Sequence, residues 1–395
     1  MDQPQRGNFE NIAVHPYYRL FDPTIEDLSG GPSWPSFHER TFERHQRFGK
    51  PMDSEYESKS SPNLRLHGKY IWVGPIVGHF GHQLLDFSTR VAETATSNPN
   101  ARYLVSTQIS PSHPESQNPT NIWHYPTLAD VPLHIRNILN WVGIPHENLT
   151  IINEPAIVDE LEVIEQGEQF MIPPADWHLD ALDEIMLQKV SISSEKIYVS
   201  RTKLGSRLGN ILGERAIEAA FVRSGFKIIY PESLPVSVQA RIYMGARLIV
   251  FAEGSAIHGL GLLGHIKANV VVIERRKNAF SSAVFACSIT PRVPSFVGIR
   301  SVEATFPSGD HWRSLTILNP ENLIDQLFDQ GIEIKNYLKP SEYWASVEED
   351  LEVILANELT DSRRIETLFP EIGLGAVEKF SEFKSIIRFI KRKEN

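Results

Sequence analysis

The stretch "GFKIIYPESLPVSVQARIYMGARLIVFAEGSAIHGLGLLG" (residues 225–264) alternates short apolar runs with a segment of helical periodicity. "KIIYP" and "RLIVFA" have the length and composition of buried strands, and "PVSVQARIYMGA" between them has the spacing of a helix. A strand, a helix and a second strand in this order predict a βαβ unit, in which the two strands lie parallel in one sheet.

The same alternation continues on both sides of this stretch. "KIYVS", "ERAIEAAFVRSGF" and "ANVVVIE" extend it as strand, helix and strand, and an earlier series runs through "KYIWVG", "GHFGHQLLDFSTRVAETA", "RYLVST", "LHIRNILNWVGI" and "LTIIN". A loop, "FMIPPADWHLD", and a helix over 179–190 separate the two series. The sequence therefore predicts an α/β protein with two Rossmann-like domains, residues 66–185 and 186–340, facing a cleft.

The two ends of the chain lack this alternation. Residues 1–65 are rich in Pro, Gly, Ser and charge and predict an irregular extension, whereas residues 341–395 predict a helical segment. The final stretch, "EKFSEFKSIIRFIKRKEN", gathers apolar residues on one side of a helix with basic residues among them. Packing of this stripe on the protein is the favoured interpretation, and peripheral contact with an anionic membrane surface is the alternative.

Composition limits the class of protein. A chain of 395 residues is longer than a single hydrophobic core usually supports, so we expect two domains with extensions. A net charge of −10 argues against a general nucleic-acid binder, so an anionic ligand must meet local arginines. The single cysteine, Cys287, excludes an intramolecular disulfide and a multi-cysteine zinc site. With no visible secretory signal and no run of about 20 apolar residues, we expect a cytoplasmic protein.

Three glycines, Gly259, Gly261 and Gly264, have the spacing of a dinucleotide fingerprint. In that fingerprint the first glycine lies at the strand-to-helix turn and a full crossover helix follows. Here the preceding strand ends near Ala252, and the next begins near Asn269, so no crossover helix fits. We expect these glycines to permit close packing of a helix on the sheet, which makes a nucleotide-dependent oxidoreductase an unfavoured alternative.

Two polar stretches follow predicted strands and suit a phosphate. "EGSAIH" (253–258) opens a helix with Gly254 and Ser255, whose amides can bind an anion, and His258 lies one turn further on. "YVSRTKLGSRLGNILGE" (198–214) places Arg201 and Arg207 in a loop beside the same cleft. The alternatives are that Ser255 caps the helix, that His258 is structural, and that the arginines lie on a solvated loop.

A third stretch, "GHFGHQLLD" (78–86), suits proton transfer. His82 and Asp86 are four residues apart and share a helix face, so together they can deprotonate a hydroxyl. In the alternative interpretation Asp86 pairs with Arg90, also four residues away. A metal site on His79 and His82 lacks a third ligand nearby.

The chain resembles glycosyltransferase family 61 in four stretches taken together. They are "GHFGHQLLD", "IYVSR" followed by Arg207 and Glu214, the stretch over residues 225–264, and "VVVIE". This family includes bacterial capsular-polysaccharide biosynthesis proteins and plant and animal xylosyl- and N-acetylglucosaminyltransferases. The similarity covers about residues 68–275. The chain departs from the family at Gly213, where many relatives have Asn, at Glu253-Gly254-Ser255, where they have His-Gly-Ala, and at Gly259-Leu260 in place of Asn-Leu.

The resemblance implies a GT-B architecture and an inverting, metal-independent transfer from a nucleotide-sugar, expected to be UDP-linked, to a glycan or polysaccharide hydroxyl. No cofactor is implied, since the nucleotide-sugar is a substrate. Such a reaction needs a base and an electropositive site for the leaving diphosphate. Asp86 is the first candidate base, with His82 orienting it or replacing it, and Glu253 is the second. The residues expected to bind the nucleotide-sugar are Arg201, Arg207, Gly254, Ser255, His258 and Glu274.

A second function stays open, because the departures fall at the expected site. A nucleotide- or sugar-binding protein on a GT-B fold, without catalysis, would keep the arginines and bind a nucleotide without turning over a donor.

Overall fold

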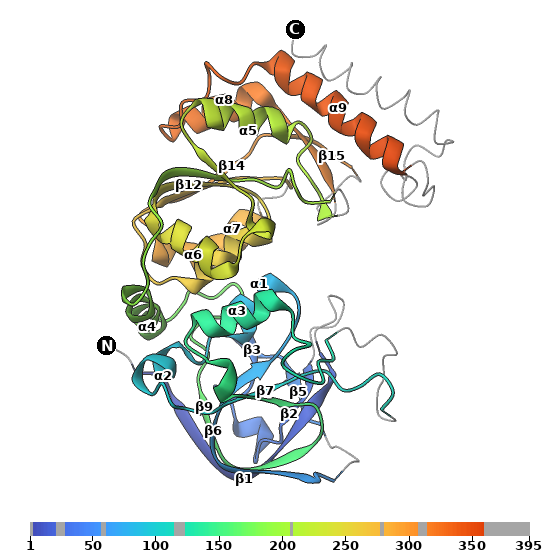
Figure 1. Ribbon diagram of the computed structural model, residues 1–395, viewed down its shortest axis with the longest axis vertical. Helices are drawn as coiled ribbons and strands as arrows, with labels where there is room; N and C mark the ends of the chain where they lie inside the picture. The colour runs from blue at the N-terminus through green and yellow to red at the C-terminus, as the bar shows by residue number, and fades with distance from the viewer. Residues whose placement is uncertain are drawn as a thin grey trace.

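The computed structural model describes residues 3–20, 28–56, 61–113, 123–205, 208–276, 280–306 and 314–358. The protein is α/β, with a seven-stranded sheet built from residues before 165 and a five-stranded sheet built from residues after 193 (Figure 1). Two short pairs complete the strands, β3 (Gln46–Arg47) with β4 (Lys50–Pro51) and β15 (Val302–Phe306) with β16 (Leu315–Leu318).

All strands of the five-stranded sheet run parallel. Its spatial order is β11-β10-β12-β13-β14, so the chain proceeds outward in one direction from β10 to β11 and in the other from β12 to β14. This is the order of a doubly wound sheet, whose ligands bind at the carboxyl ends of the strands where the direction reverses. The strands are β10 (Ser194–Val199), β11 (Lys227–Ile229), β12 (Ala246–Ala252), β13 (Asn269–Ile273) and β14 (Phe296–Ile299).

Helices cover both faces of this sheet (Figure 1). Successive residues of a strand point to opposite faces, and β12 follows this rule. Val250 packs in one apolar cluster with Phe221, while Phe251 packs in another with Tyr243. One face carries α5 (Glu214–Arg223), α8 (Pro320–Asp329) and α9 (Pro340–Glu358), and the other carries α6 (Val236–Gly245), the 3-10 helix η6 (Ser255–Leu262) and α7 (Phe280–Ile289).

The seven-stranded sheet is mixed. β6 lies parallel to both β9 and β7, and β7 lies parallel to β8, whereas β1 runs antiparallel to β9. In spatial order the strands are β5 (Asp53–Ser54), β2 (Leu28–Pro32), β1 (Arg6–Arg19), β9 (Ala156–Ile164), β6 (Leu64–Pro75), β7 (Tyr103–Ser106) and β8 (Leu149–Ile152). The associated helices are α2 (Ala92–Ser97), α3 (Leu133–Trp141) and α4 (Asp176–Leu187), with short 3-10 turns at η1 (Phe37–Glu39) and η3 (His146–Asn148). Two further 3-10 turns, η5 (Pro231–Ser233) and η7 (Thr290–Arg292), belong to the part of the chain that forms the five-stranded sheet.

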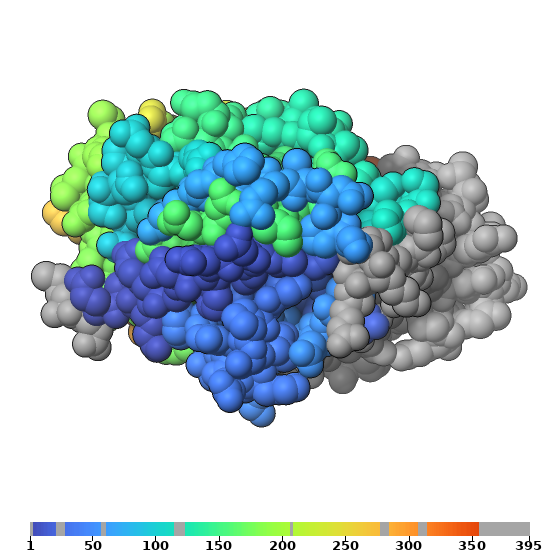
Figure 2. Space-filling model, turned by 90° about the horizontal axis from the view of Figure 1, so that it is seen from below, coloured from blue at the N-terminus to red at the C-terminus, as the bar shows by residue number. Residues whose placement is uncertain are grey.

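The prediction of an irregular segment over residues 1–65 is wrong for β1, which pairs with β9 over most of its length. Its residues cross the bottom face of the molecule (Figure 2). The strand lacks an alternating pattern because Asn11 has a φ of 51°, and the buried Phe9 and Ile12 on either side are three residues apart. A period of two is therefore not visible in this stretch of sequence.

The helix expected over residues 78–95 is broken. A short α1 (Phe80–His82) continues into a π-helical turn, η2 (Gln83–Phe87), and α2 starts only at Ala92. Gln83 causes part of the break, because its side chain accepts a hydrogen bond from Val77 N at 2.8 Å and donates one to Ser88 Oγ at 3.0 Å. These bonds tie the turn back to the end of β6, so helical spacing of the apolar residues does not produce one continuous helix.

One apolar cluster joins the two sheets. It runs from Ile71 and Tyr103 of the seven-stranded sheet through Ile135 of α3 to Val272 of the five-stranded sheet. Trp141 of α3 also donates its indole N–H to the carbonyl of Leu262 at the end of η6, at 2.8 Å. This bond holds α3, beside the seven-stranded sheet, against η6, which follows β12 of the five-stranded sheet. The amphipathic stretch 378–395 lies outside the described residues, among which no helix is long and apolar enough to cross a membrane.

Candidate active site at the carboxyl ends of the parallel strands

Arg201 lies at the reversal point of the five-stranded sheet, directly after β10. Its side chain is buried, and Nη2 donates to the carbonyls of Leu208 and Gly209 at 2.9 and 2.8 Å. Burial lowers the pKa of Arg201 from its ordinary value, and the nearby Glu214 and Glu253 oppose this shift. The predicted loop arginine is thus a partly enclosed cation rather than a solvated one. The second predicted arginine, Arg207, lies outside the described residues.

Gly254 allows Arg201 to reach across from β10 to β12. A Cβ atom on Gly254 would lie 1.9 Å from Nη1 of Arg201, so any side chain at this position would displace the guanidinium. Ser255 is exposed and is the first residue of η6, whose N-cap position is held by Gly254, so the interpretation of Ser255 as the helix cap is wrong. The guanidinium and the start of η6 therefore lie together at the strand ends, the arrangement expected of an anion site.

Glu214, at the start of α5, organises the loop that carries Arg201. One carboxylate oxygen accepts hydrogen bonds from Tyr198 Oη at 2.9 Å, Ser200 Oγ at 3.2 Å and Arg201 N at 2.8 Å. The other oxygen, Oε2, is buried and has no hydrogen-bond partner among the described residues. Burial raises the pKa of Glu214 to about 7, against the effect of these donors.

Glu253 is fully buried, and its carboxylate is occupied by its neighbours. Oε2 accepts hydrogen bonds from the backbone amides of Arg275 at 2.6 Å and Arg276 at 3.2 Å, and Oε1 forms an ion pair with the Arg276 guanidinium at 2.5 Å. These contacts fix the chain after β13 against the end of β12. They leave Glu253 enclosed, in contrast with the open carboxylate that a general base requires.

Arg275 and Arg276 were missed in the sequence, where they follow "VVVIE" as two adjacent cations directly after a strand. Arg275 is buried and donates to the carbonyl of Ser314 at 2.9 Å, while Arg276 is partly exposed. Burial, and then the charge of Arg201, lower the pKa of Arg275 to about 10. Three arginines therefore gather at the ends of β10 and β13. The predicted Glu274 is also buried there, with Oε2 3.6 Å from Arg300 Nε.

His82 and Asp86 form the pair expected at the carboxyl end of β6. Nδ1 of His82 lies 3.1 Å from Oδ2 of Asp86, which is almost completely buried, whereas the His82 side chain is 22% exposed. In the tautomer whose Nδ1–H donates to this carboxylate, the lone pair of the imidazole lies on Nε2, which can then accept a proton. The alternative pairing with Arg90 is wrong, because the Arg90 guanidinium donates to backbone carbonyls such as that of Arg44, at 2.8 Å.

His258 brings the two groups of residues together. A Cβ atom on Gly81 would lie 2.6 Å from Cδ2 of His258, so α1 is in close contact with η6. The other side of the imidazole packs edge-on against Phe285 at 5.2 Å between ring centroids. Burial, and then the nearby His82, lower the pKa of His258 to about 3, so the ring is neutral at pH 7. The imidazole thus lies between the His82 and Asp86 pair and the arginine-lined strand ends.

The glycine spacing is explained by close packing. A Cβ atom on Gly259 would lie 3.1 Å from Tyr243 of α6, one on Gly261 3.5 Å from Leu85 of η2, and one on Gly264 2.6 Å from the carbonyl of Leu179 in α4. Gly259 and Gly264 therefore do permit close packing, but the prediction that the partner is the sheet is wrong, because these contacts are with helical segments.

Within the described residues, no group of three or more His, Cys, Asp or Glu side chains is placed to hold a metal ion.

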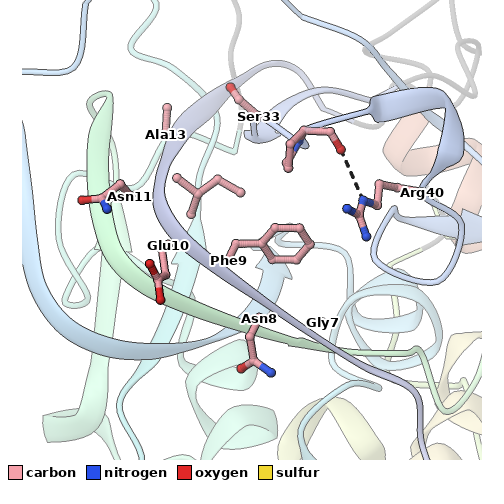
Figure 3. Close-up of a pocket in the computed structure, with 10 residues that line it drawn as sticks. Gly7, Asn8, Phe9, Glu10, Asn11, Ala13, Ser33 and Arg40 are labelled. Atoms are coloured by element: carbon pink, nitrogen blue, oxygen red, sulfur yellow. Dashed lines mark hydrogen bonds between the residues drawn. The ribbon is translucent and has the colours of Figure 1, made fainter.

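A hollow of about 440 Å³ lies on β1, where Phe9, Ser33 and Arg40 contribute to its lining and Arg40 donates to the carbonyl of Pro35 (Figure 3). None of the predicted site residues lines it, so it is separate from the strand ends described above.

The structure defines an α/β protein whose charged site lies at the reversal point of a doubly wound sheet, with a His and Asp pair held against it. Residues 80–272 match the family model described as Glycosyltransferase 61. These residues form a glycosyltransferase 61 domain, which identifies the protein as a glycosyltransferase, in class EC 2.4. A search of curated proteins found no match. The matched segment ends two residues before Glu274, so Arg275 and Arg276 lie just beyond it.

Proposed function

We propose that the chain transfers a sugar from a nucleoside-diphosphate sugar to a hydroxyl of a glycan acceptor, with inversion at the anomeric carbon. The observation that carries this proposal is the contact between Gly81 and His258, because it sets a proton acceptor, His82, beside an arginine-lined anion site. An inverting displacement needs these two elements on opposite sides of one reacting carbon.

The donor diphosphate is assigned to the ends of β10, β12 and β13. Arg201, Arg275 and Arg276 supply positive charge, and the amides of Gly254 and Ser255 supply donors. Glu253 holds Arg276 in place and is assigned a positioning role instead of the role of base. In this proposal Arg207 also binds phosphate, Glu274 binds the ribose hydroxyls, and UDP is the expected nucleotide, as in the family resemblance.

His82 is the proposed general base, and Asp86 orients it. Because Asp86 is almost fully buried behind the imidazole, an acceptor hydroxyl reaches Nε2 of His82 before it reaches the carboxylate. This reverses the order of preference that the sequence suggested. When His82 gains a proton it becomes an imidazolium cation, and the Asp86 carboxylate stabilises this positive charge.

In the chemical step the acceptor oxygen attacks the anomeric carbon, and its proton moves to Nε2 of His82. The bond from the anomeric carbon to the diphosphate oxygen breaks, and its electron pair remains on the leaving nucleoside diphosphate. Arg201, Arg275 and Arg276 stabilise the charge that develops on this oxygen. We propose that these arginines take the role that a divalent metal ion has in metal-dependent transferases.

The two sheets, joined along η6 and α1, are proposed to form the two halves of a GT-B arrangement, with acceptor on the β6 side and donor on the β10 side. A cytoplasmic location is also part of the proposal, and contact of the C-terminal stretch with the inner face of a membrane stays the alternative to its packing on the protein.

A panel of nucleotide-sugars with excess EDTA tests the proposal through release of the nucleoside diphosphate. We expect release from a UDP-sugar, and a loss of about 10²- to 10⁴-fold in His82→Ala. Asp86→Asn should lose activity while keeping nucleotide affinity, because it removes the orienting carboxylate and not the donor site.

Two outcomes decide against parts of the proposal. Nucleotide binding without release from any donor in the panel would favour the non-catalytic binding protein. Activity that disappears in EDTA and returns with Mn²⁺ would show that the arginines do not replace a metal ion.

A further inference from the structure

Trp123 lies at the carboxyl end of the seven-stranded sheet, on the side of the proposed acceptor. Its backbone is fixed to the segment that follows β7, since Trp123 N donates to Gln108 Oε1 at 3.2 Å and Trp123 O accepts from Thr107 Oγ1 at 3.0 Å. The side chain is half-buried and packs against the apolar clusters of both faces of this sheet. The indole is therefore held firmly and still reaches the surface.

The indole rests on the turn that carries the proposed base. A Cβ atom on Gly78 would lie 2.6 Å from Cζ3 of Trp123, and the carbonyl of Gly78 is 3.0 Å from Nε2 of His134. Gly78 precedes His79, whose ring centroid is 4.5 Å from that of His82. Trp123, His79 and His82 thus follow one another along the turn between β6 and η2.

This row of rings has the chemistry of a sugar-binding surface. The axial C–H groups of a pyranose form an apolar face that packs on an indole, while its equatorial hydroxyls project outward to polar groups. Among the described residues no side chain or carbonyl accepts a hydrogen bond from the indole N–H, so this donor is available. A half-buried tryptophan with an available N–H combines apolar and polar contacts in one side chain.

We propose that the acceptor is a pyranose residue that stacks on Trp123 and presents its reacting hydroxyl to His82. This inference rests on the proposed function, because it specifies the acceptor of the same reaction. Trp123 is then a residue that selects the acceptor and does not touch the donor diphosphate. His79, exposed between the indole and His82, contacts the same sugar.

Saturation-transfer NMR with UDP present and methyl pyranosides of glucose, galactose, mannose and xylose as probes tests the proposal. We expect at least one pyranoside to bind, with the strongest saturation on the axial protons of one ring face. Trp123→Leu keeps apolar volume but removes both the aromatic face and the N–H, and should weaken binding about tenfold. Trp123→Phe keeps an aromatic face without the N–H, so its affinity should lie between those of Trp123→Leu and the wild type. Phe328→Ala, which removes an exposed aromatic on α8, is the matched control and should change nothing.

The outcomes separate this inference from the proposed function. UDP binding should be unchanged in Trp123→Leu, which also shows that this variant is folded. If no pyranoside binds the wild type, or if Trp123→Leu binds as the wild type does, the inference is overturned while UDP binding still supports the donor site. Saturation spread evenly over both ring faces in the wild type would also overturn stacking, without the use of any variant.

Discussion

Gly81 of α1 and His258 of η6 are in such close contact that a Cβ atom on Gly81 would lie 2.6 Å from the imidazole. These residues belong to segments that follow β6 in one sheet and β12 in the other. Their contact sets the distance between the proposed base and the proposed donor site, so it links the fold directly to the chemistry.

Gly81→Ala should therefore impair the transfer step more than donor binding. The added methyl group must push His258 or α1 away, and a displacement of about 1 Å between reacting groups can cost about 10²-fold in rate. We expect kcat to fall by about 10- to 100-fold, with UDP affinity within about twofold of the wild type. Activity equal to the wild type would show that the contact is not needed for alignment.

Arg276→Ala should weaken nucleotide binding. The substitution removes one of the cations at the strand ends, and with it the guanidinium that forms an ion pair with the buried Glu253. We expect the Kd for UDP to rise by about 10- to 100-fold, measured by titration calorimetry. Arg247→Ala is the matched control, because Arg247 lies at the opposite end of β12 in an exposed pair with Glu195. Equal effects of the two substitutions would contradict a specific role for Arg276.

Glu214 should make stability depend on pH in a defined direction. Its folded pKa, about 7, exceeds the ordinary value of 4.5, so the folded state retains a proton that the unfolded state releases between these values. The contribution of Glu214 to stability therefore falls as pH rises from about 4.5 to 7, by up to about 3 kcal/mol.

Glu214→Gln, which cannot ionise, isolates this contribution. We expect the Tm of the wild type relative to Glu214→Gln to fall as pH increases from about 5 to about 8. A Tm difference that is constant over this range, or that changes in the opposite direction, would contradict the assignment.

Glu168 and Arg292 form a fully buried ion pair with 2.6 Å between Oε2 and Nη2. Arg292 also donates to the carbonyl of Leu260 in η6 at 3.3 Å, so the pair fixes η6 to the segment after β9. Glu168→Ala leaves a buried guanidinium without its partner and should destabilise the protein by about 3 to 5 kcal/mol in denaturant unfolding. Glu195→Ala, in an exposed pair, should cost less than about 1 kcal/mol. A similar cost for both would contradict a clamping role for Glu168.

The sequence predicted four strands of the five-stranded sheet, β10 to β13, because buried strands read as continuous apolar runs, as in "RLIVFA" and "VVVIE". The edge strand β14 was not predicted, and only its last residue, Ile299, is buried. β1 was not predictable, because Asn11 interrupts its alternation and its partner β9 lies about 150 residues away in the sequence. Pairing of this kind depends on tertiary contacts that local patterns do not contain.

The candidate site was predictable where it depends on local spacing. His82 and Asp86 are four residues apart and pair as expected, and Arg201 follows its strand directly. The enclosure of Glu253 was not predictable, because Arg275 and Arg276, which bind its carboxylate, follow the next strand, β13. The same is true of the Glu168 and Arg292 pair, whose members are 124 residues apart.

The most direct test of the account is saturation-transfer NMR of the purified protein with UDP, GDP, CMP and NAD, repeated with Arg201→Ala. The account predicts selective binding of UDP to the wild type and its loss in Arg201→Ala, because Arg201 lies at the reversal point of the sheet where the diphosphate is assigned. Binding of NAD, or no binding of any of the four nucleotides, would contradict the donor site and the transferase mechanism built on it.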